Sequence, residues 1–451
     1  MNKSPYVIIG NGIAGITCAR HIRKYDSDAS ILVISGESEH FFSRTALMYI
    51  YMGHMQYQHT KPYEDWFWEK NRIELKKTWI TSIDTTKQQL ISDTGEKIPY
   101  GTLIIATGSK PLTIGWPGED LKGVQGLYSL QDLENMEDNT QGIQRGVIVG
   151  GGLIGIEMAE MLKSRGIEVT FLVREKNFWD TVLPTEEAEL INRHIRAHDV
   201  DLRLGTELAE IISNGNGNVS AVKTNTGEEI PCQFVGLTIG VTPNISLLKN
   251  HPDIQSNRGV LVDKYFQTNI EGVYAIGDCA EFTESPGPNR KTIEQVWYTG
   301  RMHGETLAYN LTHEEKVSYK PGIWFNSAKF FDLEYQTYGH VPNNIPATLD
   351  TFHWENEAGT VAIRFVYDKT VGTIKGINSI GWRMRHAYFD KAIDEGWLFE
   401  KILTHLDKAS FDAEFATKHT AAVIQAYNTI KKRNVSLPKK GFLKRIVTAF
   451  S

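Results

Sequence analysis

The sequence predicts an α/β protein in which two similar strand–helix units precede a C-terminal α+β region. Three observations predict this fold class. Nearly continuous apolar runs alternate with helical segments as far as about residue 310, as is typical of parallel strands covered on both faces. A glycine-rich turn follows an apolar run twice. One hairpin-like segment recurs behind each turn, and the length of 451 residues fits about three domains.

Seven apolar runs are expected to form strands. Helices are expected after the first and fourth runs, over Gly12–Tyr25 and Leu153–Arg165, so that each unit begins as strand, helix, strand. The seven expected strands are Tyr6–Ile9, Ser30–Ile34, Thr102–Ala106, Gly146–Val149, Glu168–Val173, Phe234–Ile239 and Gly272–Ile276.

The pattern changes after about residue 315. Tyr335–Tyr338, Thr360–Tyr367 and Thr370–Ile377 indicate strands of an antiparallel sheet, and helices are expected from about residue 382 to residue 431. The C-terminal region is therefore expected to be a third domain, of the α+β class.

Two segments resemble each other without gaps. Asp93–Pro99 aligns with Asn225–Pro231, and the alignment runs on at equal spacing to Gly108 in the first copy and Gly240 in the second. Asp-Thr-Gly and Asn-Thr-Gly between β-branched runs predict tight hairpin turns. Because each copy lies at a similar distance behind a glycine-rich junction, the sequence indicates a duplicated unit.

The first junction has the pattern GxGxxG, with Gly10, Gly12 and Gly15 directly after a strand and Ala14 among them. The first glycine permits a tight turn, the second lets a pyrophosphate approach the backbone, and the third lets helix and strand pack closely. The helix N-terminus favours the bound anion. Glu37 follows the next strand near the spacing of a carboxylate that accepts ribose hydroxyls. The sequence predicts a dinucleotide site here.

The second junction repeats the pattern between another strand and another helix. The same physics predicts a second diphosphate on a second helix start, so that one chain holds two dinucleotide sites. The residues expected to form this site are Gly150, Gly152, Leu153, Ile154, Gly155 and Glu157.

Arg174 and Glu175 stand at the end of the second strand of this unit, and they leave two alternatives open. In one, Arg174 pairs with the 2′-phosphate of NADPH. In the other, Arg174 is a solvated charge and Glu175 accepts the ribose hydroxyls of NADH. The expected coenzyme is therefore NADH or NADPH.

Five motifs in order give the chain a family resemblance. They are GxGxxG, Ala106-Thr107-Gly108, GGGxxGxE, the GxxPN motif that begins at Gly240, and Gly277-Asp278 at the end of a strand. This order resembles the two-dinucleotide-binding-domain flavoprotein family, which includes the pyridine nucleotide–disulfide reductases, the ferredoxin and rubredoxin reductases and apoptosis-inducing factor. The resemblance is strong over about residues 5–310 and looser beyond them.

The resemblance implies FAD in a discontinuous domain of residues 1–112 and 244–314, and NAD(P)H in an inserted domain of residues 113–243. Residues 315–451 would form an α+β interface domain, through which relatives form homodimers. The resemblance also implies which residues line the sites: Ala106, Thr107, Gly108, Gly277 and Asp278 for FAD, and Gly240 for the nicotinamide coenzyme.

The segment around Arg44 is similar to the one beside the flavin in ferredoxin reductases. Branches of the family that use thiols carry a redox cysteine hereabouts, but this chain has no cysteine between Cys18 and Cys232. Because a thiolate is the nucleophile in that chemistry, we do not expect disulfide, peroxide or persulfide reduction. The third cysteine is Cys279, and no CxxC pair is present.

Three residues are candidates to lie beside the flavin and nicotinamide rings. Tyr49 stands where ferredoxin-reductase relatives often carry a lysine. Glu157 would orient the nicotinamide carboxamide, or would only cap a helix turn. Trp297 would shield one flavin face, with burial in the core as the alternative.

The expected function is that of an FAD-dependent NAD(P)H:acceptor oxidoreductase, which passes a hydride from NAD(P)H to FAD and then electrons to a small ferredoxin-like or rubredoxin-like protein. One alternative is a type II NADH:quinone oxidoreductase at the membrane surface, held through the basic amphipathic segment 439–450. The other is a redox-sensing NADH-binding protein similar to apoptosis-inducing factor. An ordinary terminal helix is the competing interpretation of segment 439–450.

Composition narrows the partners further. A net charge of −6 gives no general case for nucleic-acid binding. With no evident secretory signal and no run of about 18 apolar residues, a cytoplasmic protein is expected.

His194 and His198 have the i, i+4 spacing of a metal site, but no third ligand is evident nearby in the sequence. We therefore expect a solvated helix face there and no metal.

Overall fold

The computed structural model describes residues 5–249, 251–411 and 417–436. The chain forms two compact units. The first, here the N-terminal unit, comprises residues 1–174 and 199–321, and the second, the C-terminal unit, comprises residues 175–198 and 322–451. Within the described residues, no helix combines the length and the apolar character needed to cross a bilayer.

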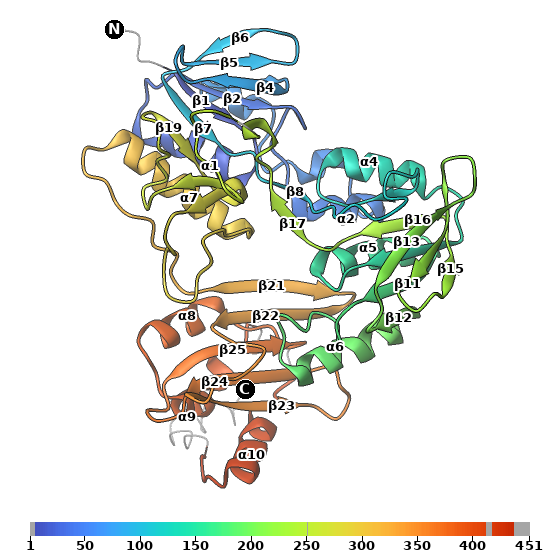
Figure 1. The fold of residues 1–451 in the computed structure, drawn as a ribbon. Helices are drawn as coiled ribbons and strands as arrows, with labels where there is room; N and C mark the ends of the chain where they lie inside the picture. The colour runs from blue at the N-terminus through green and yellow to red at the C-terminus, as the bar shows by residue number, and fades with distance from the viewer. Residues whose placement is uncertain (1–4, 250, 412–416, 437–451) are drawn as a thin grey trace. The chain divides into compact units, whose positions relative to one another are not determined.

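The N-terminal unit begins with a parallel five-stranded sheet (Figure 1). Each of its three central strands is buried at all positions but one. Helices α1 (Ile13–Tyr25) and α7 (Trp297–Thr312) pack side by side on it. Two glycines of α7 allow this contact, since a Cβ atom on Gly304 would lie 2.5 Å from the backbone oxygen of Ala14. In spatial order the strands are β19 (Val273–Ala275), β7 (Thr102–Ile105), β1 (Tyr6–Ile9), β2 (Ile31–Ser35) and β3 (Ile73–Lys77).

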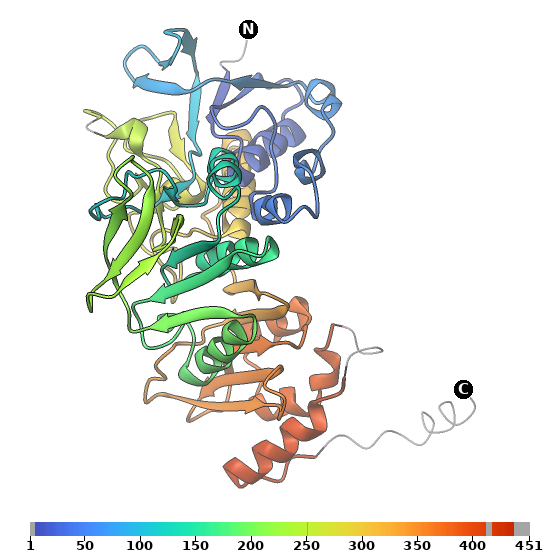
Figure 2. The ribbon, with the colours of Figure 1, turned by 90° about the vertical axis from the view of Figure 1, so that its right-hand side faces the viewer.

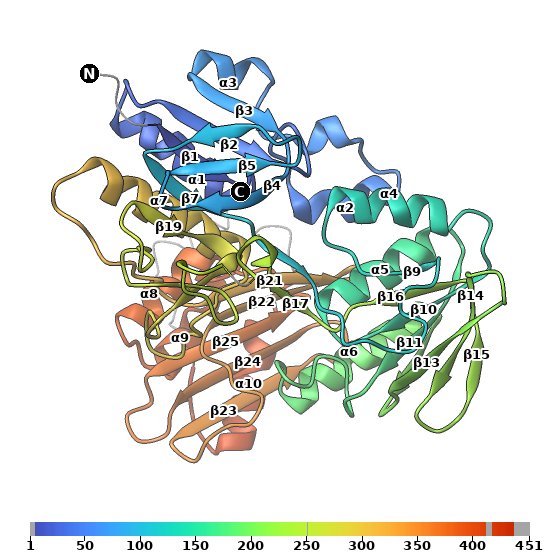
Figure 3. The ribbon, with the colours of Figure 1, turned by 45° about the horizontal axis from the view of Figure 1, so that its top comes forward.

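A second parallel sheet of the same unit repeats this order. Helix α5 (Leu153–Ser164) packs on β10, β11 and β16 (Figure 3), and α4 (Leu130–Asn139) precedes β10 in the chain. The strands are β12 (Val200–Leu204), β11 (Glu168–Val173), β10 (Arg145–Val149), β16 (Phe234–Leu237) and β9 (Val124–Gln125). The strand following each glycine turn and helix pairs in parallel with the strand preceding the turn, as in the first sheet.

The duplication extends to a three-stranded antiparallel sheet behind each glycine turn. The hairpins at the Asp-Thr-Gly and Asn-Thr-Gly turns join β5 to β6 and β14 to β15, which confirms the predicted turns. The strands are β4 (Ile80–Asp84), β5 (Gln89–Ser92) and β6 (Lys97–Pro99) in the first copy, and β13 (Leu208–Ser213), β14 (Val219–Thr224) and β15 (Glu229–Pro231) in the second.

Shorter elements complete the N-terminal unit. Strands β8 (Ser109–Pro111) and β17 (Val241–Pro243) pair antiparallel where the chain leaves and re-enters the first sheet, and β18 (Val260–Val262) pairs with β20 (Ala280–Phe282). The short helices are η1 (Arg44–Ala46), α2 (Leu47–Tyr51), η2 (Tyr57–Thr60), α3 (Trp66–Lys70), η3 (Ser246–Leu248) and η4 (Gly277–Cys279).

The C-terminal unit is an antiparallel sheet with helices on both faces. Side chains alternate along β24: Ile363 and Phe365 join the core with the later helices, whereas Arg364 bonds to α6 on the other face. The sheet lies between α6 and the later helices (Figure 2). The strands in spatial order are β21 (Phe325–Phe330), β22 (Leu333–Gly339), β25 (Ile374–Ile380), β24 (Ala362–Asp368) and β23 (Leu349–Glu355); the helices are α6 (Thr185–Ala197), α8 (His386–Asp394), α9 (Phe399–Thr404), η5 (Leu406–Lys408) and α10 (Thr420–Lys431).

The predicted α/β class, the seven strands and the antiparallel C-terminal sheet are confirmed. The ends of the seven strands differ from the predicted ones by at most two residues. The strand predicted at Thr370–Ile377 instead runs over Ile374–Ile380, because the N–H groups of Thr370 and Val371 donate to Asp368 Oδ1 in a turn. The assignment of residues 1–112 with 244–314 to FAD and of residues 113–243 to the nicotinamide coenzyme stays a prediction. The basic segment 439–450 lies outside the described residues.

Candidate functional site

The first glycine turn joins β1 to α1 and leaves room for a ligand. Gly10 has φ +114°, and a Cβ atom on it would lie 2.1 Å from the backbone oxygen of Ala106. A Cβ atom on Gly15 would lie 2.1 Å from the backbone oxygen of Gly10. Around Gly12, by contrast, nothing lies within 4 Å of such an atom. Gly10 and Gly15 are therefore required by packing, while Gly12 faces open space at the start of the helix.

The second turn, between β10 and α5, divides its roles in the same way. A Cβ atom on Gly150 would lie 2.6 Å from the oxygen of Thr238, and one on Gly155 would lie 2.6 Å from the oxygen of Gly150. At Gly152 the nearest atom is 3.9 Å away. The same arrangement, two tightly packed glycines on either side of an open one, therefore occurs in both glycine turns.

Both helix starts are suited to an anion. Gly12 and Gly152 are the N-caps of α1 and α5, and neither has a side chain that could accept a hydrogen bond from the first-turn N–H groups. Neither first turn contains an acidic residue. A diphosphate can therefore accept these N–H groups and meet the positive end of the helix dipole without repulsion. Leu153 and Ile154, predicted at the second site, are half-buried in the first turn of α5.

The Ala106-Thr107-Gly108 motif is tied to the GxxPN motif. The Thr107 hydroxyl donates to the backbone oxygen of Asn244 at 2.7 Å, and the Asn244 N–H donates to the oxygen of Gly108 at 2.8 Å. Leu112 N–H donates to the oxygen of Gly240 at 3.0 Å. These bonds hold the two passages of the chain between the sheets against each other.

Glu37, predicted to accept ribose hydroxyls, is held by Arg44. The Arg44 guanidinium donates to both carboxylate oxygens, at 2.8 and 2.7 Å, and Leu130 N–H donates to Glu37 Oε1 at 2.9 Å. Burial alone would lower the pKa of Arg44, but its hydrogen bonds and charge interaction with Glu37 raise that pKa overall. Arg44 also donates to the backbone oxygen of Tyr128 at 2.6 Å. The pair fixes the orientation of the Glu37 carboxylate at the end of β2.

Asp278 follows β19 and lies beside the hydroxyl groups of two residues that the Gly-Asp motif does not predict as its neighbours. Its Oδ2 atom accepts hydrogen bonds from Ser109 Oγ at 3.0 Å and from Tyr128 OH at 3.4 Å. Burial raises the pKa of Asp278 above its usual range. A Cβ atom on Gly277 would lie 2.9 Å from that of Ala14, so this glycine and Ala14 are needed for packing against α1.

A buried polar network supports this corner, and sequence reasoning missed most of it. Gly277 N–H donates to His303 Nδ1 at 3.1 Å, and His303 Nε2 lies 3.5 Å from a Glu294 oxygen. Tyr319 OH donates to the same Glu294 oxygen at 2.7 Å, and Arg290 lies 3.1 Å from the other. Burial is the main cause of the lowered pKa of His303. No local pattern distinguishes His303 from any other helical histidine.

The three candidates for the reacting rings lie on different elements. Glu157 is half-buried on α5, in the second turn from its start. Tyr49 is half-buried on α2 and its ring stacks against His54, with 6.1 Å between ring centroids. Trp297 is the first residue of α7 and is 49% exposed, so the alternative that it is a buried core residue is wrong.

Burial disfavours the thiolate form of all three cysteines. Cys18, Cys232 and Cys279 are each 0% exposed. Burial raises the pKa of all three thiols, and that of Cys232 to about 12. None lies in the segment around Arg44, so the expectation that this chain performs no thiol chemistry rests on burial as well as on sequence.

The order of the elements, the two glycine turns and the strand-terminal Gly277-Asp278 occur together in one family, and its model matches residues 4–304. The chain belongs to the pyridine nucleotide-disulphide oxidoreductase family. The two glycine turns fit the diphosphates of the family's cofactors, FAD and NADH or NADPH.

Relatives agree with this membership. The assimilatory nitrate reductase electron transfer subunit of Bacillus subtilis is 30% identical over 377 residues, which are 83% of this chain and 48% of that protein; the chain thus spans about half the length of this relative. The rubredoxin-NAD(+) reductase of Acinetobacter baylyi is 29% identical over 319 residues, 68% of this chain and 79% of that protein. A ferredoxin reductase from Rhodopseudomonas palustris shares the fold, with a TM-score of 0.75, 24% identity, and coverage of 84% and 91%.

Proposed function

We propose that this chain is an FAD-dependent NAD(P)H:acceptor oxidoreductase whose acceptor is a small redox protein of the rubredoxin or ferredoxin kind. The observation that carries the proposal is the pair of equivalent glycine turns, each with packing glycines around one open glycine, in a chain whose thiols are all buried. When bound, NAD(P)H supplies a hydride, and FAD accepts it and releases electrons singly or in pairs.

The protein contributes binding and orientation. The N-terminus of α1 at Gly12 would hold the FAD diphosphate, and Glu37, fixed by Arg44, would accept hydroxyls of the adenosine ribose. Asp278 would accept hydroxyls of the ribityl chain. The N-terminus of α5 would hold the diphosphate of the nicotinamide coenzyme, and Glu157 on the same helix would orient its carboxamide.

The buried thiols argue against a cysteine relay, which leaves acceptors that take electrons directly from the flavin, whether a small redox protein or a quinone. In a chain without an accessible thiolate, electrons must pass from the flavin directly to the acceptor. Rubredoxins and ferredoxins receive single electrons across a protein surface and need no cysteine relay. The names of two similar proteins, a rubredoxin-NAD(+) reductase and a ferredoxin reductase, support the same class of acceptor.

An anaerobic stopped-flow experiment tests the proposal. Purified flavoprotein is reduced with NADH or NADPH and then mixed with rubredoxin, a ferredoxin or a soluble quinone. We expect the iron proteins to reoxidise it faster than the quinone does. Faster reoxidation by quinone would favour the quinone oxidoreductase, slow turnover with every acceptor would favour the sensor, and a protein that takes up no flavin would contradict all three functions.

A further inference from the structure

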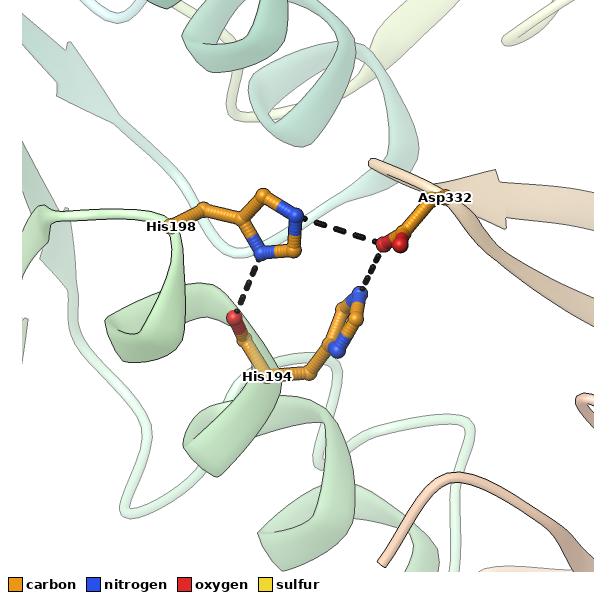
Figure 4. Close-up of side chains that lie close together, drawn as sticks. All are labelled: His194, His198 and Asp332. Carbon is orange, nitrogen blue, oxygen red and sulfur yellow. Dashed lines mark hydrogen bonds and ion pairs between the residues drawn. The ribbon is translucent and has the colours of Figure 1, made fainter.

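Three side chains of the C-terminal unit converge outside the dinucleotide sites. His194 lies in the last turn of α6 and His198 is the C-cap of that helix, while Asp332 stands in the turn between β21 and β22 (Figure 4). The Asp332 Oδ1 atom lies 2.8 Å from His194 Nε2 and 3.2 Å from His198 Nε2. Among the described residues, this is the one group of three or more histidine, cysteine or acidic side chains close enough to share a metal ion.

The fold orients the two imidazoles. The i, i+4 spacing places both rings on one face of α6, with 4.6 Å between their centroids. His198 Nδ1 bonds to the backbone oxygen of His194 at 2.9 Å, and the His198 ring stacks on Phe331, with 4.3 Å between centroids and 13° between planes. With Nδ1 occupied by a carbonyl, Nε2 of His198 is the nitrogen turned toward Asp332. Metal-binding histidines are commonly oriented by such a bond from the other ring nitrogen.

A network of ordinary hydrogen bonds accounts poorly for this arrangement. Both Nε2 atoms approach the same carboxylate oxygen, so both rings would have to carry a proton there. The Nε2 atom of His194 is buried, and the Asp332 oxygen that lies 2.8 Å from it is also the oxygen nearest to His198 Nε2. One cation held by both nitrogens and the carboxylate would satisfy all three groups at once.

The donors and their spacing fit zinc. Zinc takes histidine nitrogen and carboxylate oxygen at about 2.0–2.2 Å, and two ligand atoms at a tetrahedral angle on one ion are then about 3.3–3.4 Å apart. The two measured separations, 2.8 and 3.2 Å, are slightly shorter. The Asp332 side chain is 79% exposed, which gives an ion access from solvent. Three protein ligands leave the fourth position to water.

We propose that His194, His198 and Asp332 bind a divalent transition-metal ion, with zinc the best match. The ion ties the C-terminal end of α6 to the turn between β21 and β22. Nitrogen ligands also accept cobalt, which is coloured and so serves as a probe for the same site.

The test uses the full-length, flavin-loaded protein without a histidine tag, stripped of metal by a chelator and dialysed. Zn²⁺ is titrated against a chromophoric chelator, and Co²⁺ is followed by its visible absorption. We expect one equivalent per chain. Changing a residue that only hydrogen-bonds to a metal ligand lowers metal affinity by about 10- to 100-fold. Because His198 and Asp332 would bind the ion directly, His198→Gln and Asp332→Asn should weaken Zn²⁺ binding by at least about 100-fold.

His405→Gln is a matched control. His405 is also a helix C-cap, at the end of α9, and its Nδ1 bonds to the oxygen of Lys401 at 3.0 Å, but no metal-ligand group of the described residues includes it. This variant should bind Zn²⁺ like the unchanged protein, and Zn²⁺ should raise the midpoint of thermal unfolding of both.

Three outcomes would overturn the proposal: binding well below one equivalent, equal Zn²⁺ affinity of Asp332→Asn and the unchanged protein, or a loss in His405→Gln as large as that in His198→Gln. Because Asp332 is exposed in a turn, its variant keeps the test valid even where a histidine variant fails to fold.

Discussion

Gly12 and Gly15 stand three residues apart at the start of α1 but serve different purposes. Gly15 touches the backbone of Gly10 so closely that no side chain fits, whereas the space beside Gly12 is open. Gly12 also has an ordinary φ of −70°, which an alanine adopts without strain. At the residue scale, packing and ligand binding are thus separable by single substitutions.

Gly12→Ala should leave the fold intact and weaken flavin binding, because the new methyl group occupies the space of the diphosphate. We expect a loss of affinity of about tenfold or more, a cost of at least 1.4 kcal/mol, measured by titrating apoprotein with FAD and following flavin fluorescence. Gly15→Ala should instead destabilise the N-terminal unit by about 3 kcal/mol or more through overpacking. Equal effects of the two variants on thermal unfolding of the apoprotein would contradict this division.

The coenzyme should be decided at Arg174 and Glu175. Arg174 is exposed and Glu175 is half-buried directly after β11. If the guanidinium binds a 2′-phosphate, Arg174→Ala should lower kcat/KM for NADPH by about tenfold or more and leave that for NADH nearly unchanged. If Glu175 binds the ribose, Glu175→Ala should lower kcat/KM for NADH instead. Steady-state rates with both coenzymes and one dye acceptor measure this, and a loss shared equally by both coenzymes would exclude either role.

At the scale of elements, α6 is joined to the sheet of the C-terminal unit by a buried ion cluster. Arg364, 2% exposed, donates to Glu187 and to Glu186 at 2.7 Å each, and the Glu187 side chain is 1% exposed. A buried carboxylate that loses its cation stays desolvated without compensation. Arg364 of β24 therefore supplies the cation that compensates the buried Glu187 carboxylate between helix and sheet.

Arg364→Met should destabilise the C-terminal unit by about 3–5 kcal/mol, because it leaves Glu187 buried without its partner. Adding Glu187→Gln should recover part of that loss by removing the charge. Urea unfolding followed by tryptophan fluorescence measures both. As a control, Arg383→Met removes the exposed pair of Arg383 with Glu334 on the same sheet and should cost less than about 1 kcal/mol. Similar losses for Arg364→Met and Arg383→Met would refute the burial argument.

At the scale of the whole molecule, each unit has a histidine whose pKa is lowered chiefly by burial: the fully buried His303 in the N-terminal unit and the half-buried His353 in the C-terminal unit. Both are neutral in the folded protein near pH 7. The unfolded chain takes up protons on the same side chains below about pH 6.5. The unfolded state thus binds more protons as the pH falls, and stability falls with it.

The midpoint of thermal unfolding should therefore decrease from about pH 7.5 to pH 5.5. For the fully buried His303, the slope is at most about 1.4 kcal/mol per pH unit. His353→Gln should flatten the dependence of the C-terminal unit, whereas His386→Gln, at an exposed position of the same unit, should not. Differential scanning calorimetry at constant ionic strength measures this, and a midpoint that is constant or rises toward pH 5.5 would disprove it.

The sequence by itself determined the parts that depend on local pattern. Apolar runs specify buried parallel strands, and the spacing of Gly10, Gly12 and Gly15 specifies a turn onto a helix, because both follow from the geometry of a few consecutive residues. The repeat of the Thr-Gly-Glu hairpin revealed the duplication for the same reason.

Only the tertiary structure decided which distant side chains meet. Ser109, Tyr128 and His303 converge on Gly277-Asp278 because β8, the start of α4 and α7 pack at one corner, and no residue spacing encodes that packing. In the same way, Asp332 lies in the turn between β21 and β22, remote in sequence from His194 and His198, and meets them only in the folded protein. Contacts between segments remote in sequence depend on how whole elements bury their apolar faces, and a local pattern cannot specify them.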